Sequence, residues 1–308
     1  MNLFKYWLNF IQLVVWVLVF SNANACYKNQ SGFRKMKEVT NEAYVLGTGK
    51  KAELRLDILN KVYGPKSQML LDRIVSNKTN LRILSVGCGT GNVEILLAKR
   101  LGDAAKIIAV DISEEQLRIA KNRANSLGLK NIEFIVSDVY NLKNLKLDNC
   151  DIVYSRFLLI HLEKPDLAIF NMLNILKPNG ILICEEIVHS TMFSYPKNEY
   201  VDKAIRLISE IGIKRNLDYD LGYKLIDLLN KQNISKTEIN VYQPVFSSGS
   251  EKNLLALSLK EGAKNYVNSG LATIKEIEII YNNINSYAKS TSSIIGMASV
   301  FQVVGYKK

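Results

Sequence analysis

The chain has 308 residues, of which 48% are hydrophobic and 22% charged, and 40 basic against 29 acidic residues give it a net charge of +11. This is an ordinary globular composition, and the length suits one large domain with insertions or one domain with a cap. The lysines are spread along the chain and never form a block of five or more, which argues against nucleic acid as the partner.

The four cysteines indicate neither a metal site nor a disulfide framework. They stand at positions 26, 88, 150 and 184, without the spacing of metal ligands. We therefore predict no bound metal and favour a reducing compartment.

The first 26 residues have the three parts of a secretory signal. Lys5 precedes an apolar run at 10–20, and Ala23-Asn24-Ala25 resembles a cleavage site. Residues 27–40 then read as a linker. Cleavage near Ala25 would lead to secretion of the protein.

The same segment also fits a membrane anchor that is not cleaved. More basic residues follow the apolar run than precede it, so an anchor at residues 7–20 would leave the body of the protein in the cytoplasm. Translation could instead start at Met36. We expect a cytoplasmic protein, tethered by residues 7–20, and keep secretion as the alternative.

Residues 41–76 read as two helices, separated at Gly64-Pro65, that follow a lead-in segment at 42–47. Within the lead-in, Tyr44 is a candidate to close over a bound cofactor. The other interpretation of this region is a simple amphipathic cover for the core.

The rest of the chain is organised around the stretch from Leu84 to Leu101. An apolar run there ends in three glycines at every second position, and a helical pattern follows at once. Glycine lets the backbone approach a ligand closely, and a helix start offers free amides. A dinucleotide-binding loop would need glycine at position 92, where the chain has Asn92. The glycines are Gly87, Gly89 and Gly91.

Acidic residues end the next two predicted strands. Asp111 closes the run from Lys106, where a carboxylate can accept both hydroxyls of a ribose. The strand at 132–136 runs into Asp138, which can accept from an exocyclic amine such as that of adenine. Ser113 is the expected N-cap of the helix between these two strands, which Gly128 ends.

Two further strands complete a doubly wound parallel sheet. Residues 151–154 form the fourth, and 181–184 form the fifth, after a turn at 177–180. Glu185 and Glu186 follow the fifth strand, where they either orient an acceptor or merely end the strand. Ligands bind at the carboxyl ends of such strands, where all these side chains fall.

These motifs resemble class I S-adenosylmethionine-dependent methyltransferases, and within them the UbiE-like, small-molecule group. The similarity covers about residues 40–308. It implies a Rossmann-like, seven-stranded sheet with an antiparallel last strand. The domain would span 41–308, with its core sheet at 81–188 and helical cap insertions at about 189–230 and 247–296. The motifs that carry the resemblance are VGCGTG, AVDIS, SDV, DIVYSRFLLIHL and LKPNGILICEE.

The resemblance also assigns cofactor-binding residues for S-adenosylmethionine. Gly87, Cys88 and Gly89 would face its methionine portion. Ser155 and Arg156 would line the wall near the methyl group. The chain departs from the family at Ser85, where an acid usually helps to hold the cofactor's amino group, and at Asn179, which replaces a turn glycine. The residues expected around the nucleoside are Asp111 at the ribose and Ile112, Asp138 and Val139 at the adenine.

Methyl transfer from a sulfonium is an in-line displacement, in which alignment supplies most of the catalysis. A base is needed only where the acceptor keeps a proton, and the two histidines, His161 and His189, are the candidates. The Asn/Asp-Pro-Pro-aromatic motif of base-amine methylation is absent after the fourth strand. The expected acceptor is a small or lipid-like molecule.

Three other functions stay open at this point. They are a non-catalytic sensor or scaffold that binds the cofactor, an exported effector that methylates a host or surface molecule, and a nicotinamide oxidoreductase, against which Asn92 counts. The sequence leaves the oligomeric state open.

Overall fold

The computed structural model describes residues 50–308, with side chains from Glu53 onward. These residues belong to one compact unit. The expected signal or anchor segment (1–26), the linker (27–40) and Tyr44 all lie outside the described residues. Between residues 50 and 308, no helix is both long and apolar enough to cross a membrane.

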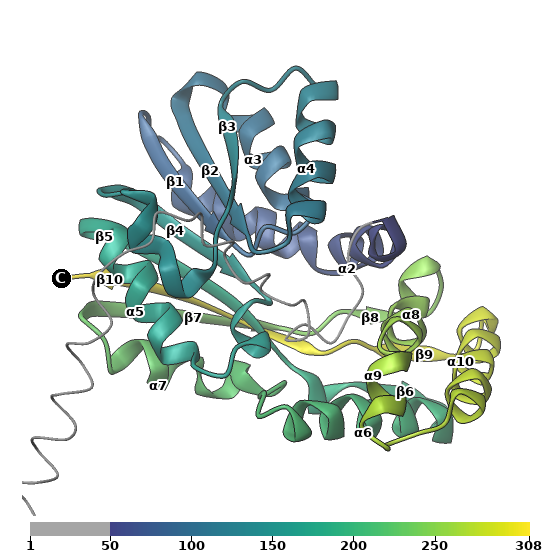
Figure 1. Ribbon diagram of the computed structural model, residues 1–308. Helices are drawn as coiled ribbons and strands as arrows, with labels where there is room; N and C mark the ends of the chain where they lie inside the picture. Colours follow the sequence, from purple (N-terminus) through teal and green to yellow (C-terminus); the bar gives the residue numbers. More distant parts are fainter. Residues whose placement is uncertain (1–49) are drawn as a thin grey trace, which may run out of the picture. The chain divides into compact units, whose positions relative to one another are not determined.

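A seven-stranded sheet forms the centre of the domain, in the order β3-β2-β1-β4-β5-β10-β7 (Figure 1). Strands β1 to β5 pair in parallel, and β10 pairs antiparallel with both β5 and β7. This confirms the predicted doubly wound, Rossmann-like sheet with an antiparallel last strand. The strands are β1 (Leu81–Val86), β2 (Ala105–Asp111), β3 (Ile132–Val136), β4 (Cys150–Arg156), β5 (Leu176–Val188), β7 (Ile234–Tyr242) and β10 (Ser299–Lys307).

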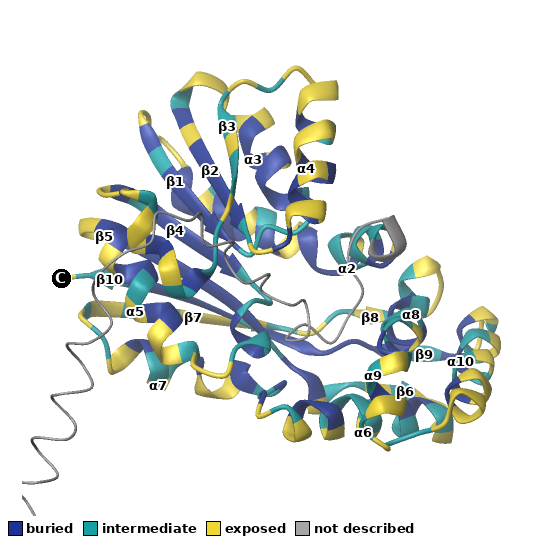
Figure 2. Cartoon of the chain, in the orientation of Figure 1, coloured by how far each residue is buried: buried dark blue, intermediate teal, exposed yellow. Residues whose placement is uncertain are grey.

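Apolar side chains leave the strands on both faces, because successive residues of a strand point in opposite directions. Ile83 packs on one face with helices α2 and α3, whereas Leu84 packs on the other face with α5 and α7. Figure 2 shows the buried strands between helices whose outer sides are exposed. The core helices are α2 (Lys50–Val75), α3 (Asn92–Leu101), α4 (Glu114–Ser126), α5 (Pro165–Ile175) and α7 (Leu225–Asn230).

Besides α7, the residues between the last core strands form four helices and a second, three-stranded sheet, β6-β9-β8, which we call the cap. Helix α2 reaches this cap: Ile58 and Val62 pack against Leu254 and Ile295. The cap elements are β6 (Phe193–Tyr195), α6 (Glu199–Lys214), β8 (Val245–Phe246), α8 (Leu254–Glu261), α9 (Ala263–Asn268), α10 (Ile274–Lys289) and β9 (Ile294–Gly296). Short 3₁₀ turns are η2 (Gly102–Ala104), η3 (Val139–Leu145), η4 (Leu159–His161), η5 (His189–Thr191), η6 (Leu221–Lys224) and η7 (Ser250–Asn253).

Two predicted breaks differ from the structure. The helix expected to end at Gly64-Pro65 continues through Pro65 as the single helix α2. A proline removes one intrahelical hydrogen bond, but α2 is held on both sides of Pro65 by buried apolar contacts. Strand β5 starts at Leu176, earlier than predicted, and the expected turn at 177–180 is a bulge between paired residues 176 and 181. Asn179 has a φ of 61° there, as turn chemistry requires.

Two buried glutamates at the carboxyl end of β5 hold neighbouring elements in place. Glu185 accepts hydrogen bonds from Ser67 (2.9 Å), Tyr154 (2.7 Å) and Gln302 (2.8 Å), so it joins α2, β4 and β10. Glu186 accepts from the backbone N–H groups of Leu158 (3.1 Å) and Leu159 (2.7 Å). These contacts fix the turn that follows β4.

Burial raises the pKa of Glu186 to about 8. Its carboxyl group is therefore protonated in the folded protein at pH values where the unfolded chain has already lost that proton. Unfolding then releases a proton, and stability falls as the pH rises from about 5 to 8.

This linkage predicts the behaviour of Glu186→Gln, which keeps the shape of the side chain but cannot ionise. Between pH 5 and 8, the unfolding free energy of the wild type should fall relative to that of the variant, by up to about 1.4 kcal/mol per pH unit. Urea unfolding at pH 5, 6.5 and 8 measures it, with Glu278→Gln on the exposed face of α10 as the control. A difference that stays constant with pH would contradict the expectation.

Candidate functional site

The glycine loop joins the end of β1 to the start of α3. The strand order reverses at β1, which has β2 on one side and β4 on the other. Gly87, Gly89 and Gly91 have φ values of 75°, 53° and 75°, which side chains rarely allow. A Cβ at Gly87 would lie 3.0 Å from Leu158, and one at Gly91 would lie 3.0 Å from Ala120. Gly89 faces open space instead, so a ligand can approach its backbone.

Asp111, at the end of β2, holds this loop. One carboxylate oxygen accepts from the N–H of Gly89 at 2.8 Å, and the other accepts from the N–H of Ser113 at 2.9 Å. Burial raises the pKa of Asp111, and these N–H groups oppose that effect. Each oxygen keeps capacity for a second donor, such as a hydroxyl group.

The residues expected at the adenine lie at the ends of β2 and β3. The side chain of Ile112 is 48% exposed, which leaves an apolar surface beside Asp111. Asp138 caps η3 by accepting from the N–H of Tyr140 at 2.9 Å, and Val139 is buried. The loop residue Cys88 is half-buried, and its N–H donates to the Val110 carbonyl, which fastens the glycine loop to β2.

The two candidates at the end of β4 differ in where their side chains lie. Ser155 is fully buried, and its hydroxyl donates to Cys184 within the core. Arg156 lies on the side of α2, where it donates to Ser67 (3.2 Å) and Asn60 (3.1 Å). Only the side chain of Arg156 is therefore turned toward the helix that borders the site.

Both histidines are desolvated. Burial, together with the charge of Arg55, lowers the pKa of His161 to about 3. Its ring packs edge-on against Tyr219. Burial also lowers the pKa of His189, whose Nε2 lies 3.1 Å from the Ile205 carbonyl and so donates to it. Both side chains are neutral at physiological pH.

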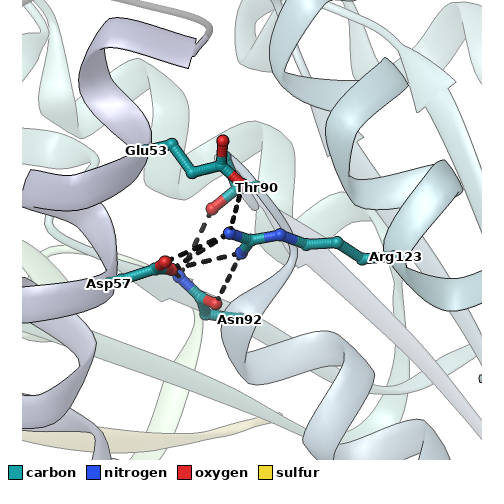
Figure 3. Close-up of polar contacts among 5 residues, drawn as sticks. All are labelled: Glu53, Asp57, Thr90, Asn92 and Arg123. Carbon is teal, nitrogen blue, oxygen red and sulfur yellow. Dashed lines mark hydrogen bonds and ion pairs between the residues drawn. The ribbon is translucent and has the colours of Figure 1, made fainter.

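A polar cluster that the sequence analysis missed fastens α2 to the glycine loop (Figure 3). Arg123 of α4 pairs with Glu53 at 2.7 Å and Asp57 at 3.2 Å, both from α2. It also donates to the side chain of Asn92 at 3.0 Å, and Asn92 in turn donates to Thr90. Asn92 therefore serves as a docking point for α2. No spacing rule in the sequence connects positions 53, 57 and 123.

A second missed residue is Glu94, in the first turn of α3. It accepts a hydrogen bond from Ser85 at 2.6 Å, and both side chains are buried. The sequence signal was available, because Ser85 lacks the expected acid and a glutamate follows the glycine loop on the adjoining helix turn.

A cavity of about 460 Å³ adjoins the turn after β4. Three leucines form its apolar wall, and two ring side chains and three charged side chains form the rest. The lining residues are Leu162, Leu167, Leu217, Tyr140, His161, Glu163, Lys164 and Arg215. Its volume is in the range of small-molecule sites. Among residues 50–308, no group of three or more His, Cys, Asp and Glu side chains is arranged to hold a metal ion.

Several known methyltransferases are similar to this chain in sequence. A demethylmenaquinone methyltransferase from Lactococcus lactis is 32% identical over 117 residues, which are 38% of this chain and 46% of that protein. The ubiquinone/menaquinone biosynthesis C-methyltransferase UbiE from Pseudomonas entomophila is 28% identical over 155 residues, 49% of this chain and 58% of that protein. The chain thus spans about half the length of the curated relatives it matches.

A solved structure supports the fold. The YcgJ protein from Bacillus subtilis matches with a TM-score of 0.54 at 15% identity, over 79% of this chain and 98% of that one. The family model described as "Methyltransferase domain" matches residues 77–236, just over half of the chain. Together with the glycine loop and Asp111, this match shows that the chain belongs to the methyltransferase-domain family.

Proposed function

We propose that this protein transfers a methyl group from S-adenosylmethionine to a small-molecule or lipid-like acceptor. One observation carries the proposal: the open backbone at Gly89 and the carboxylate of Asp111 lie together at the carboxyl ends of β1 and β2. Family membership supports S-adenosylmethionine as the cofactor.

The residues present fit this cofactor. The remaining acceptor capacity of Asp111 suits the two ribose hydroxyls, and the exposed side of Ile112 suits the adenine ring. Asp138, flanked by Val139, would accept from the adenine amine, and the backbone of the glycine loop would follow the methionine portion. When bound, the cofactor supplies an electrophilic methyl group on a sulfonium.

The protein's own contribution is then positioning. The glycine loop and Asp111 fix the cofactor's direction, and Arg156 and α2 border the space beside it. A histidine with a pKa of about 3, such as His161, takes up a proton poorly at neutral pH. We therefore assign structural roles to His161 and His189, and alignment rather than proton transfer to the site.

The acceptor class rests on the relatives and on the cavity. The relatives named above are quinone-biosynthesis methyltransferases. The cavity beside His161 has an apolar wall of three leucines next to charged side chains, which suits an acceptor with both apolar and polar parts. At the end of β4, Tyr154 donates a hydrogen bond to Glu185 and Arg156 donates to Ser67 of α2, and this stretch lacks the motif of base-amine methylation. These features count against methylation of nucleic-acid bases.

We further propose that the protein works in the cytoplasm, tethered to a membrane by residues 7–20. An apolar acceptor dissolved in that membrane would then lie close to the enzyme. Intact-mass analysis of the protein in the membrane fraction tests the tether. A mature chain that starts after Ala25 and is found outside the cell would instead support secretion.

We expect Asp111→Asn to weaken binding of S-adenosylhomocysteine by about a hundredfold, because two hydrogen bonds to a charged group are lost. Titration calorimetry measures the affinity, with melting temperatures as the check on folding. The matched control is Asp103→Asn, an exposed residue at the opposite end of β2. Equal affinities for the two variants would refute the ribose assignment.

Gly89→Ala should weaken the same binding by about ten- to a hundredfold, because a methyl group would stand where the ligand approaches. Gly128→Ala is its matched control, since Gly128 also has a positive φ, 69°, and faces open space. Both variants should lose about 1–2 kcal/mol of stability from backbone strain. If the control also binds weakly, strain rather than contact is responsible.

Turnover separates a methyltransferase from a sensor or scaffold. The full chain with isotope-labelled S-adenosylmethionine and demethylated quinones should yield labelled product, and Asp111→Asn should abolish it at low cofactor concentration. Tight binding of the cofactor without label transfer to any of a panel of quinone, phenol and lipid acceptors would favour the sensor.

A further inference from the structure

Only one of the two carboxylate oxygens of Glu94 has a hydrogen-bond partner among residues 53–308. Its Oε1 atom accepts from the Ser85 hydroxyl at 2.6 Å. Its Oε2 atom is buried and has no hydrogen-bond partner among residues 53–308. Buried polar atoms in native proteins nearly always have a partner, so an orphaned carboxylate oxygen beside a ligand loop indicates a missing donor.

This carboxylate lies next to the position where the resemblance to the family leads us to expect an acid that holds the cofactor's amino group. Ser85, at the end of β1, stands where an acid is expected, and its hydroxyl is too short to replace one. The Glu94 carboxylate lies within one hydrogen bond of that hydroxyl, at 2.6 Å. Helix α3 therefore supplies, through Glu94, the carboxylate that β1 lacks at Ser85.

Charges around Glu94 place it at the glycine loop. The carboxylate interacts with Arg156 and with Asp111. Burial raises the pKa of the Cys88 thiol, and the charge of Glu94 raises it further. Of these groups, only Arg156 is positive, and its guanidinium is engaged by Asn60 and Ser67 of α2. The two carboxylates of Glu94 and Asp111 could therefore balance the charge of a second cation near the loop.

We propose that Glu94 binds the α-ammonium group of the cofactor's methionine portion through Oε2, and that Ser85 is the positioning residue that orients it. The ammonium group donates up to three hydrogen bonds and so supplies both the missing donor and the counter-charge. This inference rests on the proposed function, because it assigns one contact within the same site.

The experiment compares two ligands that differ only in this amino group. Calorimetric titration of the full chain with S-adenosylhomocysteine and with its desamino analogue isolates the contribution of the ammonium. Glu94→Gln should weaken binding of S-adenosylhomocysteine by about ten- to a hundredfold and leave the affinity for the analogue unchanged. Glu114→Gln, an exposed glutamate in the first turn of α4, is the matched control.

A double variant that moves the carboxylate from position 94 to position 85 distinguishes loss of the contact from loss of folded structure. The double variant Ser85→Asp/Glu94→Gln returns the acid to the strand and should recover most of the affinity for S-adenosylhomocysteine. Equal losses for both ligands in Glu94→Gln, or no recovery in the double variant, would overturn the role of Glu94 and leave the proposed function intact. A wild-type chain that binds neither ligand would overturn both.

Discussion

The contact between the Asp111 carboxylate and the Gly89 N–H is the interaction on which the site depends. It ties the end of β2 to a loop whose glycines all have positive φ, and a loop of this kind has little side-chain packing of its own. Because the same carboxylate also accepts from Ser113, the start of α4 is fixed by the same group. One acidic residue therefore sets the geometry of two connections, and any ligand that uses Asp111 meets a preorganised surface.

Buried carboxylates recur along this edge of the sheet, and each is satisfied differently. Glu185 accepts from three side-chain donors. Glu186 accepts two backbone N–H groups on Oε1, and Glu94 accepts the Ser85 hydroxyl on Oε1, so the Oε2 atoms of Glu186 and Glu94 are both buried without a partner among the described residues. A buried acid without enough donors favours its protonated form, as the raised pKa of Glu186 illustrates. What distinguishes Glu94 from Glu186 is its place, because Glu94 contacts Ser85 in the strand that leads into the glycine loop, whereas Glu186 holds the turn after β4.

Most of the fold was predictable because its signals are local. Apolar runs that end in glycine or acid marked the strands, and Ser113 and Gly128 marked the ends of α4. The break expected at Pro65 was wrong, because tertiary packing there overrides a local rule. The turn expected at 177–180 occurs as a bulge within β5, with Asn179 at a positive φ. Of the site, the glycine loop and Asp111 were visible from sequence. Arg123 was not, because its partner Asp57 is 66 positions away and belongs to another element. The serine at position 85 was a signal for Glu94, which lies nine positions further along the chain.

Helix α2 is held from two opposite directions within a single turn. Glu53 and Asp57 lie on one face and pair with Arg123 of the core, whereas Arg55 lies on the other face and pairs with Glu261 of the cap. The Arg55 pair is buried, but the Arg123 pairs are partly exposed and so more open to screening by salt. Rising salt concentration should therefore weaken the contacts of α2 with Arg123 before it weakens the Arg55–Glu261 contact with the cap.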